Sequence, residues 1–199
     1  MNNLPIILAS ASPARLQLLR QIGITPDFVI PSDIDEAEQA GELPRQLANR
    51  LSFEKAAFIA ATVDHGIIIG ADTIPTVGRR IMRKAMTAED VRLSLQLLSQ
   101  RRHSVYTGVC VIKKTSTETV KLIKVVKSIV KFRHLSTSEI EYFCSTNQGI
   151  DKAGGYTLTG YAESFVSYLS GSFSNIIGLP LCETVTMLKS VGVKTQNLL

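Results

Sequence analysis

The sequence predicts an α/β fold, and three observations support this class. Strand-like apolar runs alternate with helical patterns along the chain, helix-capping residues precede several of the helical patterns, and the run at residues 66–71 has no polar interruption. An uninterrupted apolar run is typical of a strand that helices cover on both faces of a sheet. We therefore expect a sheet flanked by helices.

The first strand, residues 5–9, leads directly into a helix. Ser12 suits the N-cap position and Pro13 the first helical position, where a missing N–H donor costs nothing. Gly23 is placed to end the helix. The apolar residues that follow at helical spacing are Leu16, Leu19 and Ile22.

This strand-to-helix junction also suits an anion. Ser10 and Ser12 follow the strand, Arg15 lies in the first turns of the helix, and unpaired N–H groups together with the helix dipole favour negative charge at that end. Phosphate is the first ligand to consider. The same residues also suit an ordinary helix cap, and the local pattern alone does not separate the two.

The remaining elements follow in order. A short strand is expected at residues 28–30, a long helix at 43–63 and a strand at 66–72 that ends on Asp72. A helix at 87–99 begins with Thr87 as its N-cap and an acidic first turn. Later elements are expected as strands at 104–112 and 122–132, joined by the polar segment 113–121, a helix at 136–144, a strand at 165–169 and a helix at 181–191.

Composition limits the class of protein. The chain has 199 residues, 45% hydrophobic and 20% charged, and no repeat or linker divides it, so we expect a single domain over residues 1–199. The net charge of +5 favours anionic partners. It is too small for a dedicated nucleic-acid binder, and the lack of tryptophan argues against base stacking. A small phosphorylated substrate fits better.

The cysteines and the N-terminus bear on location. Cys110, Cys144 and Cys182 are odd in number and far apart, so we expect buried free thiols and neither a disulfide framework nor a zinc site. No signal peptide or membrane-spanning stretch is evident. The expected location is the cytoplasm, without membrane association.

Two carboxylates and two lysines are candidates for chemistry. Asp72, at the expected strand end, could bind a divalent metal or take a proton from water, or it could simply hydrogen-bond the adjoining turn. Glu36 is a second loop carboxylate, which by itself would be solvated. Lys55, among apolar neighbours, and Lys84 could neutralise phosphate, although most lysines on helices are solvated.

Five motifs together resemble the Maf family of nucleoside triphosphate pyrophosphatases, from about residue 6 to residue 190. Five motifs in register are a strong signal, although each alone is weak. They are Ser-Ala-Ser-Pro-Ala-Arg at residues 10–15, Gly-Ala-Asp-Thr at 70–73, Val-Tyr-Thr-Gly-Val at 105–109, Asp-Lys-Ala-Gly-Gly-Tyr at 151–156 and Gly-Ser-Phe-Ser-Asn-Ile-Ile-Gly-Leu-Pro-Leu at 171–181.

The resemblance implies an enzyme and its site. It implies hydrolysis of a pyrimidine or modified nucleoside triphosphate to the monophosphate and pyrophosphate, with Mg²⁺ or Mn²⁺, in a house-cleaning role. The implied fold has a mixed central sheet, is related to that of inosine triphosphate pyrophosphatase and has a cleft between two lobes. The implied roles are substrate binding for Ser10, Arg15, Lys55 and Lys84, catalytic base for Asp72, and metal binding for Glu36 and Asp72.

Departures from the family pattern concern substrate choice. The family has Arg or Trp where this chain has Ala14, and the pyrimidine subfamily has Gln where this chain has Thr159, although Thr73 matches that subfamily. Arg83-Lys84-Ala85 replaces Gly-Lys-Pro but keeps the lysine. We expect working chemistry with altered or relaxed base selection.

Two other functions compete with this one. The resemblance, to a family once named for inhibition of septum formation, also allows a regulator of cell division, and the charge and Arg101-Arg102 would suit one that binds nucleotide or nucleic acid without turnover. A pyrophosphatase for deaminated purines is a second alternative. For the enzyme, the expected partner is the nucleoside triphosphate, with no stable nucleic-acid complex, and a homodimer is compatible with the sequence.

Overall fold

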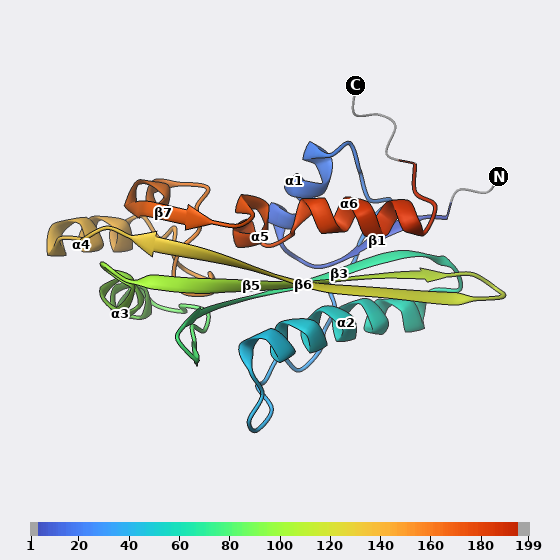
Figure 1. Ribbon diagram of the computed structural model, residues 1–199, viewed down its shortest axis with the longest axis horizontal. Coiled ribbons are helices and arrows are strands. Elements are labelled where there is room, and N and C mark those ends of the chain that lie inside the picture. Colours follow the sequence, from blue (N-terminus) through green and yellow to red (C-terminus); the bar gives the residue numbers. More distant parts are fainter. Residues whose placement is uncertain (1–3, 195–199) are drawn as a thin grey trace. The chain divides into compact units, whose positions relative to one another are not determined.

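The computed structural model describes residues 4–194 and shows a mixed sheet of seven strands with helices packed against it (Figure 1). β1 pairs in parallel with β2 and β3, whereas β4 pairs antiparallel with β3 and β7 antiparallel with β6. The predicted α/β class and mixed sheet are confirmed. The strands are β1 (Ile6–Ala9), β2 (Phe28–Val29), β3 (Gly66–Val77), β4 (Arg80–Ile81), β5 (Arg102–Lys114), β6 (Thr119–Phe132) and β7 (Val166–Ser170), and the sheet order is β2-β1-β3-β5-β6-β7 with β4 beside β3.

Three of the helices begin directly after Ser12, Thr87 and Ser136, residue types that favour the N-cap. Thr87 accepts a hydrogen bond from the Asp90 amide, and Ser136 accepts one from the Glu139 amide, each in a capping box. No helix among residues 4–194 is long and apolar enough to cross a membrane. The helices are α1 (Pro13–Gln21), α2 (Pro44–Thr62), α3 (Ala88–Leu98), α4 (Thr137–Ser145), α5 (Phe173–Ile177) and α6 (Leu181–Ser190), with a 3₁₀ helix η1 (Tyr161–Phe165).

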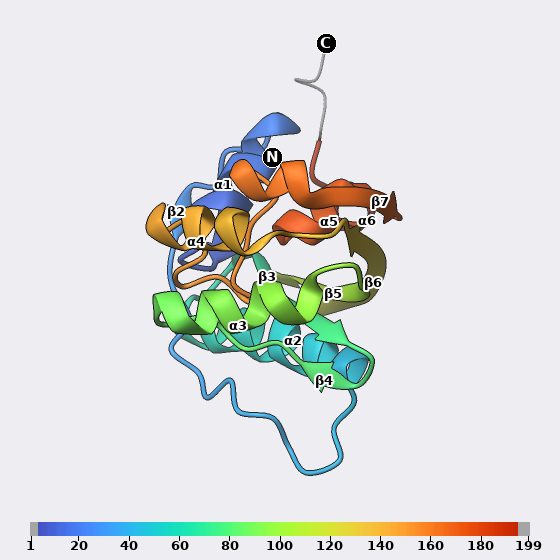
Figure 2. The same ribbon diagram turned by 90° about the vertical axis from the view of Figure 1, so that its left-hand side faces the viewer.

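The described residues divide into two compact units. Each of the strands β3, β5 and β6 contributes residues to both units. The first unit comprises residues 4–72, 107–126 and 178–194. Its strands have α2 on one face and α1 and α6 on the other (Figure 2). Its core joins the strands to α2 through Ile7, Ile68, Cys110, Ala56 and Ile59.

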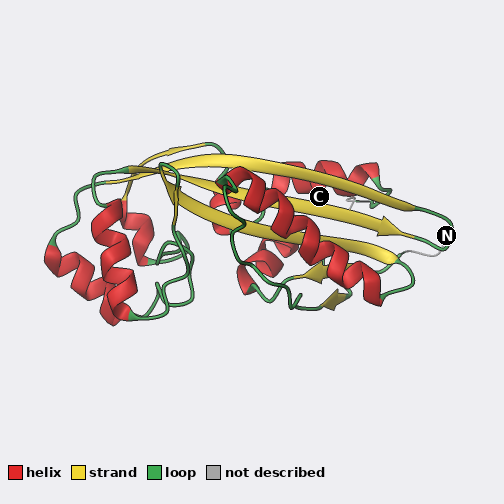
Figure 3. Ribbon diagram, turned by 90° about the horizontal axis from the view of Figure 1, so that it is seen from below, coloured by secondary structure: helices red, strands yellow, loops and turns green. Residues whose placement is uncertain are grey.

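Helix α2 approaches the strand backbone closely because two glycines face it. A Cβ atom on Gly70 would lie 2.5 Å from the Ser52 carbonyl oxygen, and one on Gly108 would lie 2.0 Å from the Ala48 carbonyl oxygen. Only a residue without a side chain fits at either strand position. The long helix therefore packs directly along the strands, as seen in Figure 3.

The second unit comprises residues 73–106 and 127–177. Helices α3 and α4 pack against each other, and an aromatic cluster forms part of the core. Its rings meet edge to face in T-shaped contacts, a geometry that aromatic pairs prefer. The cluster contains His103, Phe132, Phe143, Tyr156 and Phe165.

Two predictions from the sequence need correction. Asp72 does not end a strand, because β3 continues to Val77 and pairs there with β4. Cys182 is exposed, whereas Cys110 and Cys144 are buried, and all three thiols are free.

Candidate active site

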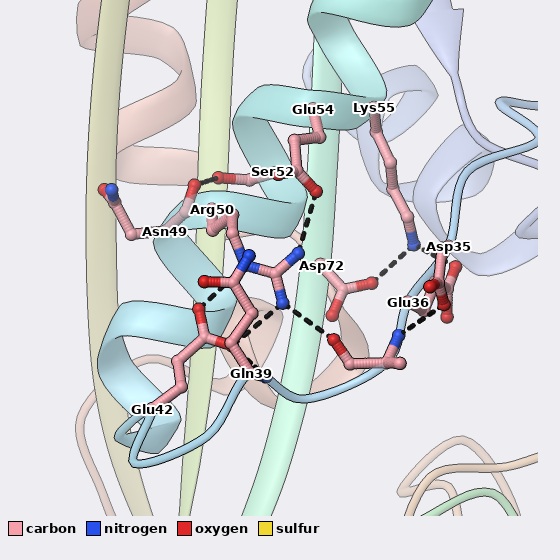
Figure 4. A network of polar contacts seen from close by, with 11 residues as sticks. Asp35, Glu36, Gln39, Glu42, Asn49, Arg50, Ser52, Glu54, Lys55 and Asp72 are labelled. Carbon is pink, nitrogen blue, oxygen red and sulfur yellow. Dashed lines mark hydrogen bonds and ion pairs between the residues drawn. The ribbon is translucent and has the colours of Figure 1, made fainter.

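The centre of the candidate site is the ammonium group of Lys55, which lies between two carboxylates. Lys55 Nζ is 2.5 Å from Asp72 Oδ1 and 2.6 Å from Glu36 Oε1 (Figure 4). The Lys55 and Asp72 side chains are 8% and 9% exposed, whereas that of Glu36 is 45% exposed. One cation thus holds a buried carboxylate and a solvent-accessible one side by side.

The close packing of α2 explains how Lys55 reaches Asp72. Lys55 is on the buried face of α2, beside the residues that contact Gly70, and Asp72 is two residues beyond Gly70 on the same face of β3. Gly70 is also the residue that pairs with Ala9 at the end of β1. Asp72 therefore lies just past the carboxyl end of β1, near the residues that follow that strand.

The strand-to-helix junction after β1 contains an organised network of hydrogen bonds. Arg15 Nη1 donates to Ser10 Oγ at 3.0 Å, Arg15 Nε donates to the Gly178 carbonyl at 2.9 Å, and the Ser12 amide donates to Ser10 Oγ at 3.2 Å. Ser12 occupies the N-cap of α1, but its side chain makes no capping hydrogen bond. The junction is therefore more than a local cap, because its buried serine orients an arginine.

Electrostatics connect this junction to the carboxylates. Burial lowers the pKa of the Arg15 guanidinium, and the negative charges of Asp72 and Glu36 act in the opposite direction. Arg15 therefore belongs to the same charged group as Lys55. Two cations and two carboxylates lie together, and the structure brings together five of the predicted site residues: Ser10, Arg15, Glu36, Lys55 and Asp72.

Lys84 belongs to the second unit and has a different environment. Its Nζ lies 3.7 Å from Asp151 Oδ1, with the two side chains 56% and 67% exposed. Its backbone forms a bridge with Ala153, and Asp151 has a left-handed backbone with φ of +58°. An exposed ammonium in this loop is accessible to an anion such as phosphate.

The three residues expected to control base selection lie in different elements of the fold, and none of them is fully buried. Ala14 is half-buried in the first turn of α1, next to Arg15. Thr73 is half-buried and follows Asp72 in β3. Thr159 is exposed, and its hydroxyl is 3.1 Å from that of Thr157. Ala14 belongs to the first unit and both threonines to the second.

Sequence reasoning missed three contacts at the site. The Gly178 carbonyl, 163 positions from Arg15, fixes the guanidinium. Asp151 pairs with Lys84. Arg50 contacts the loop that contains Glu36. Of its contacts, the sequence could have indicated only the pair with Glu54, which lies four residues later on the same helix.

The carboxylates fit a divalent cation of the magnesium type. Among residues 4–194 no group of three or more His, Cys, Asp or Glu side chains is arranged to hold a metal ion. Mg²⁺, however, is usually bound by one or two carboxylates together with substrate phosphates and water. Asp72 and Glu36 converge on one cation already, and their oxygens are the ligands that such an ion prefers.

Comparison with known proteins gives consistent matches over almost the whole chain. A model of the Maf-like protein family matches residues 5–191. A nucleoside triphosphate pyrophosphatase of Rickettsia felis is 53% identical over 196 residues, covering 98% of this chain and 97% of the relative. The protein of the same name from Rickettsia rickettsii (strain Sheila Smith) is 52% identical over 198 residues, covering 99% and 92%. Among solved structures, the Staphylococcus aureus Ham1 protein matches with a TM-score of 0.48 and 15% identity, covering 94% of this chain and 98% of that chain.

Proposed function

The chain belongs to the Maf-like protein family, and on this premise we propose that it is a hydrolase, a nucleoside triphosphate pyrophosphatase. The reaction converts a nucleoside triphosphate and water to the nucleoside monophosphate and pyrophosphate. The observation that carries the proposal is the Lys55 ammonium held between Asp72 and Glu36, beside the Ser10–Arg15 junction. A protein that only binds phosphate would gain nothing from carboxylates there.

Asp72 is the proposed general base. The buried ammonium of Lys55 donates to its carboxylate at 2.5 Å and fixes the position of this proton acceptor. A water oxygen attacks the α-phosphorus, the bond from that phosphorus to the bridging oxygen breaks, and pyrophosphate leaves with the bond electrons. The water proton passes to Asp72. No covalent enzyme intermediate is needed.

The cations compensate the charge of the substrate. Arg15 and Ser10, at the N-terminus of α1, suit one group of phosphate oxygens, and Lys55 and Lys84 supply further positive charge. Positioning and electrostatic stabilisation are the main requirements of phosphoryl chemistry. These four residues are therefore the proposed substrate-binding set.

Glu36 and Asp72 would hold the divalent cation, Mg²⁺ or Mn²⁺. When bound, such an ion stabilises negative charge on the phosphate oxygens and on the leaving pyrophosphate. The two carboxylates then have distinct roles, since buried Asp72 also accepts the proton and the more exposed Glu36 serves only the cation.

Substrate preference and cellular role are part of the same proposal. We assign base selection to Ala14, Thr73 and Thr159, and propose a pyrimidine or modified nucleotide as substrate in a house-cleaning role. Ala14 offers only a methyl group where the family has a large side chain, which favours relaxed selection. We further propose that residues 1–199 act as one functional domain in the cytoplasm, since the matched family model extends through residues of both units.

The test is pyrophosphate release from a panel of standard, deaminated and methylated nucleoside triphosphates, with Mg²⁺ or Mn²⁺. Asp72→Asn should lower turnover by about 10²–10⁴-fold, because it removes the base, and should leave nucleotide binding largely intact. Asp64→Asn, which removes an exposed carboxylate of the same kind after α2, is the matched control and should keep wild-type turnover.

The result that contradicts the proposal is a folded wild-type protein with metal that releases pyrophosphate from no nucleotide. If function in cells then survives Asp72→Asn, and binding to long polyanions falls steeply with salt, the regulator is the better description. Preference for inosine or xanthosine triphosphate would indicate the deaminated-purine enzyme instead.

A further inference from the structure

Glu36 lies in a connection that has no regular secondary structure. The segment between β2 and α2 contains neither helix nor strand, yet it brings Glu36 within 2.6 Å of Lys55. Ordering a loop costs conformational entropy, and an ion pair to a carboxylate that is 45% exposed offsets only part of that cost. A further contact with α2 also holds this loop.

That contact is the guanidinium of Arg50, on the same helix as Lys55. Arg50 Nη2 donates to the Ala37 carbonyl at 2.8 Å. Arg50 Nε and Nη2 donate to the two carboxylate oxygens of Glu42, each at 2.8 Å, and Nη1 donates to Glu54 at 2.9 Å (Figure 4). Three of these four hydrogen bonds reach the loop, and Glu54 belongs to α2.

The ion pair between Arg50 and Glu42 has the geometry and the burial of a strong contact. The contact is bidentate and charge-assisted, and the side chains are only 18% and 8% exposed. The hydrogen bond from Arg50 lowers the pKa of the Glu42 carboxyl, so this carboxylate stays ionised as the pH falls. The Glu42 carboxylate also accepts a hydrogen bond from the backbone N–H of Gln39 at 3.1 Å. This bond joins two residues of the loop just before α2 begins.

The residue that follows Glu36 is held by hydrogen bonds at both its N–H and its carbonyl group. Ala37 follows Glu36 directly, its carbonyl accepts from Arg50, and its N–H donates to Asp35 Oδ1 at 2.9 Å. We propose that Arg50 is a positioning residue, which holds this loop so that Glu36 stays against Lys55 and beside Asp72. Arg50 acts through Glu36 and touches neither substrate nor metal. The inference rests on the proposed pyrophosphatase function, because it makes Arg50 a determinant of that reaction.

The experiment compares substitutions that share one chemistry but differ in their contact with the loop. Arg50→Gln and Glu42→Gln break the loop contact. Glu54→Gln removes the carboxylate that touches Arg50 from within α2, and Arg45→Gln removes an exposed arginine from the same helix. Arg50→Lys keeps the charge but cannot make the bidentate contact.

The first readout is amide hydrogen exchange in the nucleotide-free and metal-free protein. Arg50→Gln and Arg50→Lys should raise exchange at the amides of residues 37–42 by at least about tenfold, while amides in the middle of α2 stay protected. Glu42→Gln should act in the same direction. Glu54→Gln and Arg45→Gln should stay within about twofold of wild type.

The second readout is the dependence of pyrophosphate release on Mg²⁺ at saturating nucleotide. Misplacement of Glu36 should lower kcat by about 10–100-fold in Arg50→Gln and raise the Mg²⁺ concentration for half-maximal rate, with a smaller change in KM. Both control substitutions should leave these values unchanged.

The outcomes separate this inference from the function on which it rests. Active wild type together with an Arg50→Gln protein that shows unchanged loop exchange and unchanged Mg²⁺ dependence overturns the inference alone. Wild type without pyrophosphate release overturns the proposed function, and raised loop exchange in Arg50→Gln would then still show that Arg50 orders the loop. Loss of protection throughout α2 in Arg50→Gln would make Arg50 a structural residue of the helix and would also overturn the inference.

Discussion

Each compact unit contains a lysine–aspartate ion pair, and the two pairs differ in almost every physical respect. Lys55 and Asp72 are 2.5 Å apart and more than nine-tenths buried, whereas Lys84 and Asp151 are 3.7 Å apart and more than half exposed. The packing of α2 fixes the first pair. The second pair is screened by water, so the proposed contact of Lys84 with phosphate would cost little in lost pairing with Asp151. The same two residue types thus form a buried, closely held pair in one unit and an exposed, weakly held pair in the other.

The second unit also buries a polar pair, but a neutral one. His103 Nε2 is 2.5 Å from the Tyr156 hydroxyl inside the aromatic cluster. Burial lowers the pKa of His103 to about 4 and raises that of Tyr156, so both are uncharged near pH 7. The buried pair of the second unit is therefore neutral, whereas the Lys55 cluster is built from an ion pair.

The largest expected effect on stability comes from breaking the buried pair. Lys55→Met leaves Asp72 buried without its nearest cation, and we expect the free energy of unfolding to fall by about 3–5 kcal/mol. Urea titration at pH 7 measures this change. A Lys55→Met protein as stable as wild type would show that burial does not distinguish the two lysine–aspartate pairs.

The buried neutral pair predicts a dependence of stability on pH. The ordinary pKa of histidine is 6.5 and that of folded His103 is about 4, so the unfolded chain binds a proton first as the pH falls. This contribution to stability is complete above pH 6.5, declines as the pH falls below it and is lost by about pH 4, with a total of about 3 kcal/mol.

Urea unfolding between pH 7.5 and pH 4.5 tests the role of His103. His103→Gln should remove most of this slope, and His65→Gln, at an exposed site, should retain it. An equal slope in the His103→Gln protein and wild type would assign the pH dependence to other groups.

The smallest expected effect on stability comes from the exposed pair. Lys84→Met should change the free energy of unfolding by less than about 1 kcal/mol, because an exposed ion pair contributes little. It should nevertheless raise KM for the nucleotide by about tenfold or more, because a charged contact to phosphate is lost. Urea titration and steady-state kinetics of pyrophosphate release measure the two quantities. Asp151→Asn is the control, with near-normal stability and a KM no higher than that of wild type.

The sequence was informative wherever local chemistry decides the structure. Pro13, Thr87 and Ser136 marked helix starts within one residue, since capping depends only on neighbours in the chain. The family resemblance named Lys55 and Asp72 but gave no sign that they touch. Their contact depends on a helix meeting a strand 17 residues later in the chain, which no periodicity encodes.

Tertiary contacts account for the errors as well. Asp72 was expected at a strand end because the apolar run stops there, but pairing with β4 extends β3 to Val77. Arg50 looked like one more helix-surface arginine, because its loop partners are irregular in structure and Ala37 contributes only a backbone carbonyl. A hydrogen bond to a backbone carbonyl cannot be predicted from the pattern of side chains, because every residue has such a carbonyl.

The absence of side chains at Gly70 and Gly108 has a consequence for redesign. Two missing methyl groups set the distance between α2 and the strands, and through it the reach of the Lys55 ammonium. The three positions that we propose for base selection, Ala14, Thr73 and Thr159, do not include either glycine. A library that tests nucleotide preference at those positions should therefore hold both glycines constant.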